Sequence, residues 1–343
     1  MSEVKSLGAP RGAAAAAPAM LRVRVHARRA EAQDVVSLEL RSRDGEALPA
    51  FSAGAHIDVE VPAGATLGRG ALLRQYSLAN DSRERGRYLI GVGREAASRG
   101  GSLALHETLR VGDELRIGAP RNNFPLDETA AHSVLVAGGI GITPLLAMAR
   151  RLSALGARWT LYYCVRSPER AAFLQELLGL PGGQVITVFD GLPGVARLDL
   201  AKVVQQAPAG AHFYCCGPAP LLQAFVEATQ AIETARVHLE WFAAAPGGAD
   251  AATASTAYTV HLKRSGTSVQ VGPGDNLLDA LMAANAPVDY SCREGLCGTC
   301  ETRVLCGTPL HGDPVYAARA TPPTDRMLVC VSRSAGGDLT LDL

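Results

Sequence analysis

Residues 134–144 read VLVAGGIGITP, and this stretch decides how the middle of the chain folds. Four apolar residues come first, glycines follow at Gly138, Gly139 and Gly141, and a helical pattern then continues to Leu155. A continuous apolar run that ends in glycines is typical of a buried strand leading through a tight turn into a helix. The stretch therefore predicts one strand–turn–helix unit.

Similar units follow along the chain. Residues 159–165 have the pattern of a strand, residues 169–178 that of a helix, and residues 185–189 and 212–215 those of two more strands. Strands that alternate with helices are typical of a parallel sheet with helices on its faces. We therefore predict an α/β domain over residues 127–242.

The chain has a different character before this domain. Between residues 21 and 126 the apolar runs are short and are broken by Gly, Pro and Asp, as in residues 21–25, 35–40, 56–61 and 88–92. This spacing is typical of antiparallel strands and predicts a small β-barrel. Residues 1–20 are rich in Ala, Gly and Pro without periodicity, which predicts a disordered tail.

The C-terminal part begins with a change of composition. Residues 243–257 are mainly Ala, Gly, Thr and Ser, which predicts an interdomain linker. In residues 258–343, a predicted hairpin over residues 258–271 and a predicted helix over residues 276–285 precede a cysteine-rich loop. Because such a small unit has a small core, we expect the cysteine-rich loop to contribute to its stability.

The overall composition excludes several functional classes. Lys plus Arg and Asp plus Glu both number 33 in the 343 residues, so no overall charge draws the chain to nucleic acid. No apolar run reaches the roughly 18 to 20 residues that a membrane-spanning helix needs. Residues 13–20 imitate a secretory signal only loosely, because the run is short and alanine is weakly apolar. We expect a cytoplasmic protein that contacts neither nucleic acid nor membrane.

Four of the eight cysteines form a recognisable pattern. The spacing is C-x4-C-x2-C, followed after 29 residues by a fourth cysteine: Cys292, Cys297, Cys300 and Cys330. Plant-type [2Fe-2S] ferredoxins have this spacing, since three thiolates on one loop and a distant fourth hold two irons. Structural zinc is the alternative, but zinc sites usually pair two C-x2-C knuckles, and only one is present. The pattern therefore predicts the ligands of a [2Fe-2S] cluster.

The glycine turn is a candidate phosphate site. Glycines let the backbone approach a pyrophosphate, and the following helix N-terminus favours negative charge. A second turn, Cys216-Gly217-Pro218, ends another predicted parallel strand, and ligands of open α/β sheets bind beyond the carboxyl ends of strands. Ordinary strand-to-helix connections are the alternative for both turns, because the spacing is not G-x-G-x-x-G.

These motifs together resemble the phthalate dioxygenase reductases and vanillate demethylase reductases, a family of ferredoxin-reductase-like flavoproteins. Residues 74–78, RQYSL, are similar to the family's R-x-Y-S-[LT] flavin motif, and residues 98–102, SRGGS, to its second flavin-phosphate loop. Residues 120–124, PRNNF, are similar to the segment that leads out of the barrel. The resemblance implies these flavin-binding residues: Arg74, Gln75, Tyr76, Ser77, Leu78, Ser98, Gly100, Gly101 and Ser102.

The resemblance also implies the nicotinamide site and the reacting groups. Its nicotinamide contacts are Gly138, Gly139, Gly141, Thr143, Pro144, Cys216, Gly217 and Pro218. In residues 240–242, EWF, the family places an aromatic ring over the flavin, a role that falls to Phe242. A core aromatic is the alternative for this residue. The implied catalytic residues are Phe242, Ser77 and Cys216.

The implied fold has three domains: an antiparallel β-barrel for flavin, an α/β parallel-sheet nicotinamide domain and an α+β, β-grasp-like [2Fe-2S] ferredoxin domain. A C-terminal cluster domain favours FMN over FAD, because family members with this domain order use FMN. NADH is preferred by resemblance. However, residues 165–167, VRS, offer no acidic group for the ribose, and Arg166, Ser167 and Arg170 could tolerate the 2′-phosphate of NADPH.

The resemblance further implies the electron path and the partner. Hydride carries two electrons and the cluster accepts one, so a flavin must stand between them. The implied acceptor is the terminal oxygenase of a two-component Rieske system acting on an aromatic acid, and the reductase is expected to be a monomer. Two alternatives remain, namely a haem monooxygenase as acceptor and a non-catalytic redox sensor.

Overall fold

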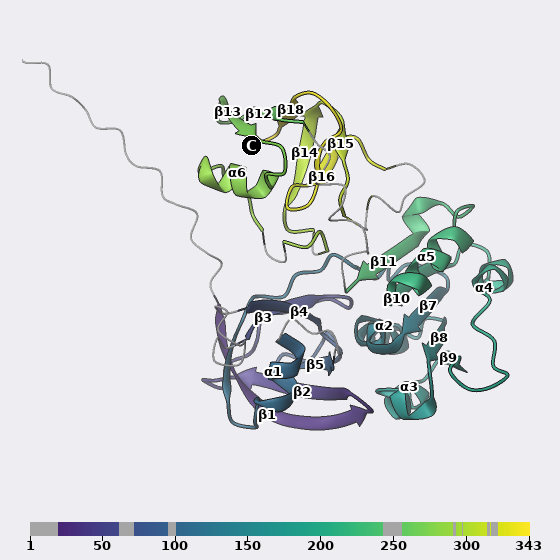
Figure 1. Cartoon of the computed structure of the whole chain (residues 1–343). Helices are drawn as coiled ribbons and strands as arrows, with labels where there is room; N and C mark the ends of the chain where they lie inside the picture. Colours follow the sequence, from purple (N-terminus) through teal and green to yellow (C-terminus); the bar gives the residue numbers. More distant parts are fainter. Residues whose placement is uncertain are drawn as a thin grey trace, which may run out of the picture.

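The computed structural model describes residues 20–61, 72–94, 101–242, 256–290, 293–296, 298–313, 316 and 322–343. Nearly all of the predicted tail and linker lies outside these residues. Three bodies are seen in Figure 1: a mainly antiparallel sheet, a parallel sheet with helices, and a smaller mixed sheet above them. The predicted fold class is therefore confirmed, whereas the exact domain limits stay a prediction.

The first body is built from alternating strands. Its elements are β1 (Leu21–Ala32), β2 (Val35–Ser42), β3 (His56–Val61), β4 (Leu72–Ser77), β5 (Tyr88–Gly93), α1 (Gly101–Glu107) and β6 (Glu114–Ile117). Within the described residues these strands form one sheet in the order β4-β3-β6-β1-β2-β5. A bridge between Leu78 and Ile90 joins its two ends. Because strand side chains point alternately inward and outward, Val23 and Val25 are buried while Arg22 and Arg24 are exposed.

The second body is a parallel sheet. Its strands are β7 (Ser133–Gly138), β8 (Trp159–Val165), β9 (Gly183–Phe189), β10 (His212–Gly217) and β11 (Val237–Trp241). Its helices are α2 (Ile142–Leu155), α3 (Leu174–Leu178), α4 (Leu200–Gln206) and α5 (Ala219–Ala228), with 3-10 turns η2 (Gly139–Gly141), η3 (Pro168–Arg170) and η4 (Thr234–Arg236). All of β7 is buried, as expected for a strand covered on both faces.

One predicted helix of this domain is wrong. Residues 169–178 do not form a single helix: η3 comes first, and α3 begins only at Leu174. Phe173, between them, has a φ of 59°. A left-handed residue interrupts the helical hydrogen-bond pattern, and the ring of Phe173 is instead buried in the domain core. Core packing therefore overrides the local helical pattern.

The third body is a small mixed sheet. Its elements are β12 (Tyr258–Leu262), β13 (Thr267–Val271), α6 (Leu277–Ala283), β14 (Glu301–Cys306), β15 (Pro309–Leu310), β16 (Arg326–Leu328), β17 (Arg333–Ser334) and β18 (Leu339–Leu341). The main sheet has the order β13-β12-β18-β14-β16. The helix begins where expected, because the Asn276 side chain accepts a hydrogen bond from the Asp279 amide. None of the described helices is long and apolar enough to span a membrane.

The barrel and the parallel-sheet domain are packed directly against each other. The Gln33 amide, in the β1–β2 turn, donates to the Glu169 carbonyl at 2.7 Å. Next to it, Asp34 pairs with Arg170 at 3.4 Å. On β5, a β-carbon at Gly91 would lie 2.6 Å from the Thr143 methyl group. The approach of α2 to the barrel therefore requires glycine at this position.

Candidate functional site

The predicted flavin motif lies along β4, at the side of the barrel that faces α1. A β-carbon at Gly101 would stand 3.1 Å from Arg74 Nε, so the two predicted phosphate-binding segments meet here. Gln75 donates to Asp58 at 3.3 Å, Tyr76 is half-buried against the barrel core, and Leu78 is fully buried. Ser102 lies in α1, whereas Ser98 and Gly100 lie outside the described residues.

Ser77, Cys216 and Glu240 meet where the barrel touches the parallel sheet. Ser77 ends β4, and its hydroxyl donates to Glu240 Oε2 at 3.2 Å. Cys216 Sγ lies 4.0 Å from the same oxygen. The strand register explains the meeting, because Cys216 on β10 pairs directly with Glu240 on β11. The structure thus joins two predicted catalytic residues through a carboxyl group that sequence reasoning passed over.

Burial controls the protonation of this group. It raises the pKa of Glu240 to about 8, although the hydrogen bond from Ser77 opposes the shift. Burial, with Glu240 nearby, also raises the pKa of the Cys216 thiol well above its usual value. At neutral pH both groups therefore hold their protons, and Cys216 is a thiol rather than a nucleophilic thiolate. Phe242 lies two residues after Glu240, and its side chain is 39% exposed.

The glycine turn adjoins this cluster. In the sheet, β8 and β9 follow on one side of β7, whereas β10 and β11, the next strands in the sequence, lie on its other side. Ligands of open α/β sheets bind at such a reversal of strand order. A β-carbon at Gly141 would stand 2.2 Å from the Cys216 carbonyl oxygen, and one at Gly138 would stand 2.6 Å from Pro218 Cδ. The two predicted nicotinamide turns therefore lie in contact, and glycine permits that contact.

The remaining predicted nicotinamide residues differ in exposure. Gly139 has a φ of 54°, and the space where its side chain would stand is open. Gly217 is half-buried, whereas Pro218 is exposed. Thr143 and Pro144 are buried. The Thr143 hydroxyl donates to the Ile140 carbonyl at 3.1 Å. Thr143 therefore helps to shape the turn and to pack α2 against the barrel.

Sequence reasoning also missed an acidic group near the end of β8. Residues 165–167 supply none, but β9 runs beside β8 and pairs Phe189 with Val165. The next residue, Asp190, donates its amide to the Val165 carbonyl at 3.1 Å. Asp190 therefore lies at the same carboxyl edge as the glycine turn. Only the strand order reveals it, since Asp190 lies 25 residues from Val165 in the sequence.

Two of the predicted cluster ligands are buried next to each other. Cys300 and Cys330 are each 2% exposed, and the Val329 amide donates to the Cys300 carbonyl at 3.4 Å, which places these two predicted ligands side by side. Cys292 and Cys297 lie outside the described residues. Three left-handed positions curl the loop: Arg293, Gly295 and Gly298, with φ of 58°, 71° and 69°.

The residues present fit a [2Fe-2S] cluster and a flavin, the two groups that the resemblance implies. The buried Thr299 hydroxyl has no hydrogen-bond partner among the described residues, as expected of a donor that serves a cluster sulfur. No described carboxylate forms an ion pair with Arg74, whose described hydrogen bond goes to the Leu73 carbonyl. Its guanidinium is therefore available to a phosphate. Cys300, Cys330 and Thr299 would hold the cluster, and Arg74, Tyr76 and Ser77 the flavin.

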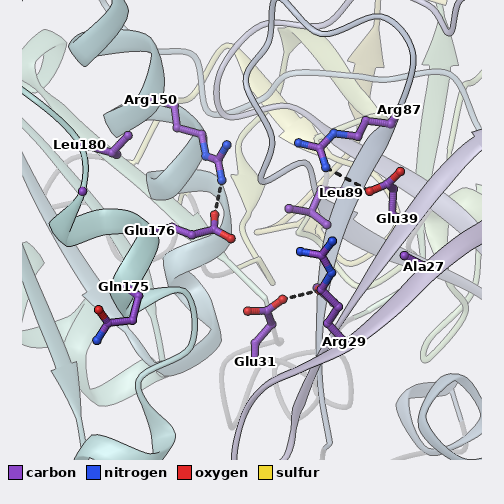
Figure 2. A pocket seen from close by; sticks show the side chains of 12 residues that line it. Ala27, Arg29, Glu31, Glu39, Arg87, Leu89, Arg150, Gln175, Glu176 and Leu180 are labelled. Carbon is purple, nitrogen blue, oxygen red and sulfur yellow. Dashed lines mark hydrogen bonds and ion pairs between the residues drawn. The ribbon is translucent and has the colours of Figure 1, made fainter.

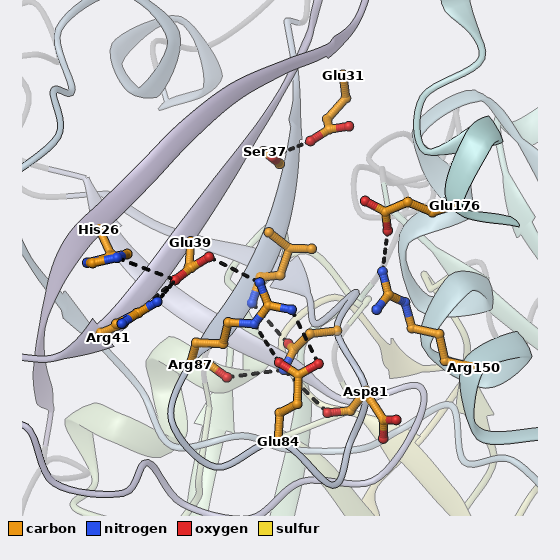
Figure 3. A network of polar contacts seen from close by, with 12 residues as sticks. His26, Glu31, Ser37, Glu39, Arg41, Asp81, Glu84, Arg87, Arg150 and Glu176 are labelled. Atoms are coloured by element: carbon orange, nitrogen blue, oxygen red, sulfur yellow. Dashed lines mark hydrogen bonds and ion pairs between the residues drawn. The ribbon is translucent and has the colours of Figure 1, made fainter. Parts of the chain in front are cut away.

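A separate cleft of about 400 Å³ lies between the barrel and α2–α3 (Figure 2). None of the residues predicted to bind a cofactor is among those described as lining it. Its charged groups are largely paired, as Figure 3 shows: Glu39 with Arg41 and Arg87, and Arg150 with Glu176. Burial alone would raise the pKa of Glu39, but the hydrogen bonds from both arginines lower it. We interpret this cleft as an ion-paired seam between domains.

Comparisons with known proteins identify the C-terminal body first. Residues 260–335 match the 2Fe-2S iron-sulfur cluster binding domain, which decides against structural zinc. Over 330 residues the chain is 47% identical to phenoxybenzoate dioxygenase subunit beta of Ectopseudomonas oleovorans, covering 96% of this chain and 99% of that protein.

Two solved structures are also similar. Phthalate dioxygenase reductase, described as modular for electron transfer from pyridine nucleotides to [2Fe-2S], is 39% identical with a TM-score of 0.65, covering 94% of this chain and 98% of its own. A self-sufficient cytochrome P450 monooxygenase is 38% identical with a TM-score of 0.79, and the match covers 94% of this chain but 41% of that one. The chain therefore belongs to the family of phthalate dioxygenase reductases and vanillate O-demethylase oxidoreductases, which are oxidoreductases that carry a [2Fe-2S] domain.

Proposed function

We propose that this reductase takes electrons from NADH, passes them through FMN to a [2Fe-2S] cluster, and delivers them to the terminal oxygenase of a Rieske system acting on an aromatic acid. The observation that carries the proposal is the contact between Ser77 and Glu240. It joins the end of the flavin motif to the strand end beside the nicotinamide turns, within a chain that also contains the cluster domain.

The proposed flavin site uses the barrel residues. Arg74 would bind the phosphate together with Gly101 and Ser102 at the start of α1, and with Ser98 and Gly100, which precede them in the sequence. Tyr76 and Ser77 contact the ring system, while Gln75 and Leu78 fix the strand, since one is bonded to Asp58 and the other is buried in the core. Flavin, when bound, accepts two electrons as hydride and releases them one at a time.

The chain's own groups control the surroundings of the reacting atoms. Glu240 holds a proton on its carboxyl group, and Ser77 donates a hydrogen bond to that group. Cys216 lies next to the same carboxyl oxygen as a neutral thiol. These three groups add no net charge next to the flavin at neutral pH. Phe242 would cover the flavin ring, and its side chain is exposed enough to make that contact.

NADH is the proposed coenzyme. A carboxylate near the adenine ribose accepts hydrogen bonds from the 2′-hydroxyl and repels a 2′-phosphate, and Asp190 lies at the carboxyl edge of the sheet for this role. Arg170, one of the residues that could tolerate the phosphate, pairs with Asp34 instead. Gly138, Gly139, Gly141, Gly217 and Pro218 form the proposed walls of the pyrophosphate and nicotinamide site.

Exchange of this carboxylate tests the coenzyme assignment. Asp190→Ser should raise kcat/KM for NADPH relative to NADH by about tenfold or more, since one charged hydrogen bond accounts for roughly 1.5 to 3 kcal/mol. Glu233→Ser is the control, because Glu233 precedes β11 at the opposite edge of the sheet. Equal ratios in Asp190→Ser and wild type would exclude Asp190 from coenzyme selection.

The proposed partner is an oxygenase, as the names of the relatives suggest. No residue in the chain identifies the aromatic substrate, because the reductase does not bind it. A haem monooxygenase is a second candidate acceptor, since a similar module occurs within the P450 chain described above. We further propose that the reductase is monomeric and works in the cytoplasm.

The spectrum of the purified protein tests the core of the proposal. Anaerobic NADH should bleach both flavin bands and the broader cluster absorption, and the flavin released by denaturation should be FMN. Cys330→Ser should retain the flavin bleaching and lose the cluster absorption. A wild-type protein without flavin, or one whose flavin NADH does not reduce, would overturn the proposal.

A further inference from the structure

The segment Arg121–Phe124 is held in one conformation by bonds at each of its ends. Arg121 exchanges backbone hydrogen bonds with His56 at 3.0 and 2.9 Å, and its guanidinium pairs with Asp58 at 2.8 Å. Asn122 donates to Ser52 Oγ at 2.7 Å and accepts from the Phe124 amide at 3.0 Å. The segment is therefore a rigid extension of the barrel rather than an ordinary connecting loop.

The same bonds tie this segment to the flavin motif. Asp58, the partner of Arg121, also accepts a hydrogen bond from Gln75 at 3.3 Å. Gln75 stands next to Arg74 and Tyr76 on β4. One carboxylate on β3 thus connects the residues of the proposed flavin site with the start of the segment, so the two are held in a fixed relation to each other.

Asn123 extends from this segment to the cluster loop. A β-carbon at Gly298 would stand 3.5 Å from Asn123 Nδ2 and 3.7 Å from its Cγ, so the amide group lies over the backbone of Gly298. Gly298 has a φ of 69°, which belongs to the tight curl of the loop. Across 175 residues of sequence, the barrel therefore contacts the loop at a position between two predicted cluster ligands, Cys297 and Cys300.

A second residue of the loop contacts the parallel-sheet domain. Leu296 is half-buried and packs against the apolar cluster that contains Leu222, Phe225 and Trp241. In Figure 1 the C-terminal body stands above the other two, on the side of β11. Leu296 and Gly298 thus contact two different domains, and both of those domains also contribute to the Ser77–Glu240 contact.

We propose that Asn123 and Leu296 are positioning residues, which fix the cluster loop at the junction of barrel and parallel sheet so that electrons cross from flavin to cluster there. The inference rests on the proposed function, because it assigns the geometry of that electron transfer. Electron transfer slows steeply as the distance between the two redox groups grows, so a displaced cluster loop should slow this one step. Neither residue takes part in hydride transfer, which occurs earlier.

Rapid anaerobic mixing of the holoprotein with NADH tests this inference, because flavin bleaching and cluster reduction are followed in one trace. In Asn123→Ala, flavin reduction should stay within about twofold of wild type while cluster reduction slows about tenfold or more. Leu296→Ala should behave in the same way. Gln270→Ala, an exposed amide on β13 at the opposite edge of the third sheet, is the matched control and should change neither rate.

Two further measurements distinguish a displaced cluster loop from an unfolded one. Iron content and the electron paramagnetic resonance spectrum after chemical reduction should equal those of wild type in both variants, since a loop that merely unfolded would change them. Wild-type cluster-reduction rates in both variants, or equal slowing of flavin and cluster reduction, would overturn the inference. Failure of NADH to reduce the flavin or cluster of the wild-type protein would instead overturn the proposed function, and this inference with it.

Discussion

Glu240→Gln should remove a pH dependence of stability that the structure assigns to one carboxyl group. Glu240 is half-buried beside Ser77 and Cys216, and burial raises its pKa from 4.5 to about 8. Between these values the folded protein keeps the proton and the unfolded chain releases it. The stabilisation is therefore complete below pH 4.5 and is lost as the pH rises through 8.

The size of this effect follows from the shift. At about 1.4 kcal/mol per pKa unit, the ceiling is about 5 kcal/mol. Because the group is partly accessible to solvent, we expect about 2 to 3 kcal/mol, which corresponds to a melting-temperature change of about 4 to 10 °C. Glutamine resembles the protonated acid but has no proton to lose.

Thermal unfolding from pH 5 to pH 9, followed by near-ultraviolet circular dichroism at matched flavin content, measures the effect. Glu240→Gln should melt with wild type at pH 5 and several degrees above it at pH 9. Ser77→Ala is the control, since loss of its hydrogen bond should raise the pKa of Glu240 further and preserve the wild-type slope. Identical pH profiles of wild type and Glu240→Gln would refute the reasoning.

Three other substitutions test separate parts of the site. Gly141→Ala should cost about 3 kcal/mol or more, because its β-carbon would stand 2.2 Å from the Cys216 carbonyl; a melting temperature within 2 °C of wild type would contradict the close approach. Arg74→Ala should weaken flavin retention about tenfold through loss of a charged hydrogen bond, measured as flavin content after gel filtration; undiminished flavin content would argue against the assignment. Cys300→Ser should abolish reduction of one-electron protein acceptors while NADH still bleaches the flavin, and loss of both would mean that the flavin site depends on the cluster.

Several features of the protein could be predicted from sequence because their physical cause is local. The spacing of the four cysteines is set by the geometry of one loop and one distant turn, after β16, around a cluster. The glycines of residues 134–144 predict a strand–turn–helix unit, because the conformation of such a turn depends mainly on the residues within it. Strand limits such as Trp159–Val165 and Tyr258–Leu262 were likewise predictable, since in each run large apolar residues recur at every second position and turn residues follow.

Only the tertiary structure decided which of these parts meet. Glu240 joins Ser77 across 163 residues because β11 pairs with β10 in a register that brings its end to the barrel. Asp190 lies beside the end of β8 because β9 runs beside β8, and Asn123 reaches Gly298 because the barrel and the third sheet pack together. Sequence patterns report the state of short segments, whereas contacts between distant segments depend on register and packing of the whole chain. The sequence by itself therefore determined the cofactor chemistry of this reductase, and the packed structure decided which of the predicted site residues come together.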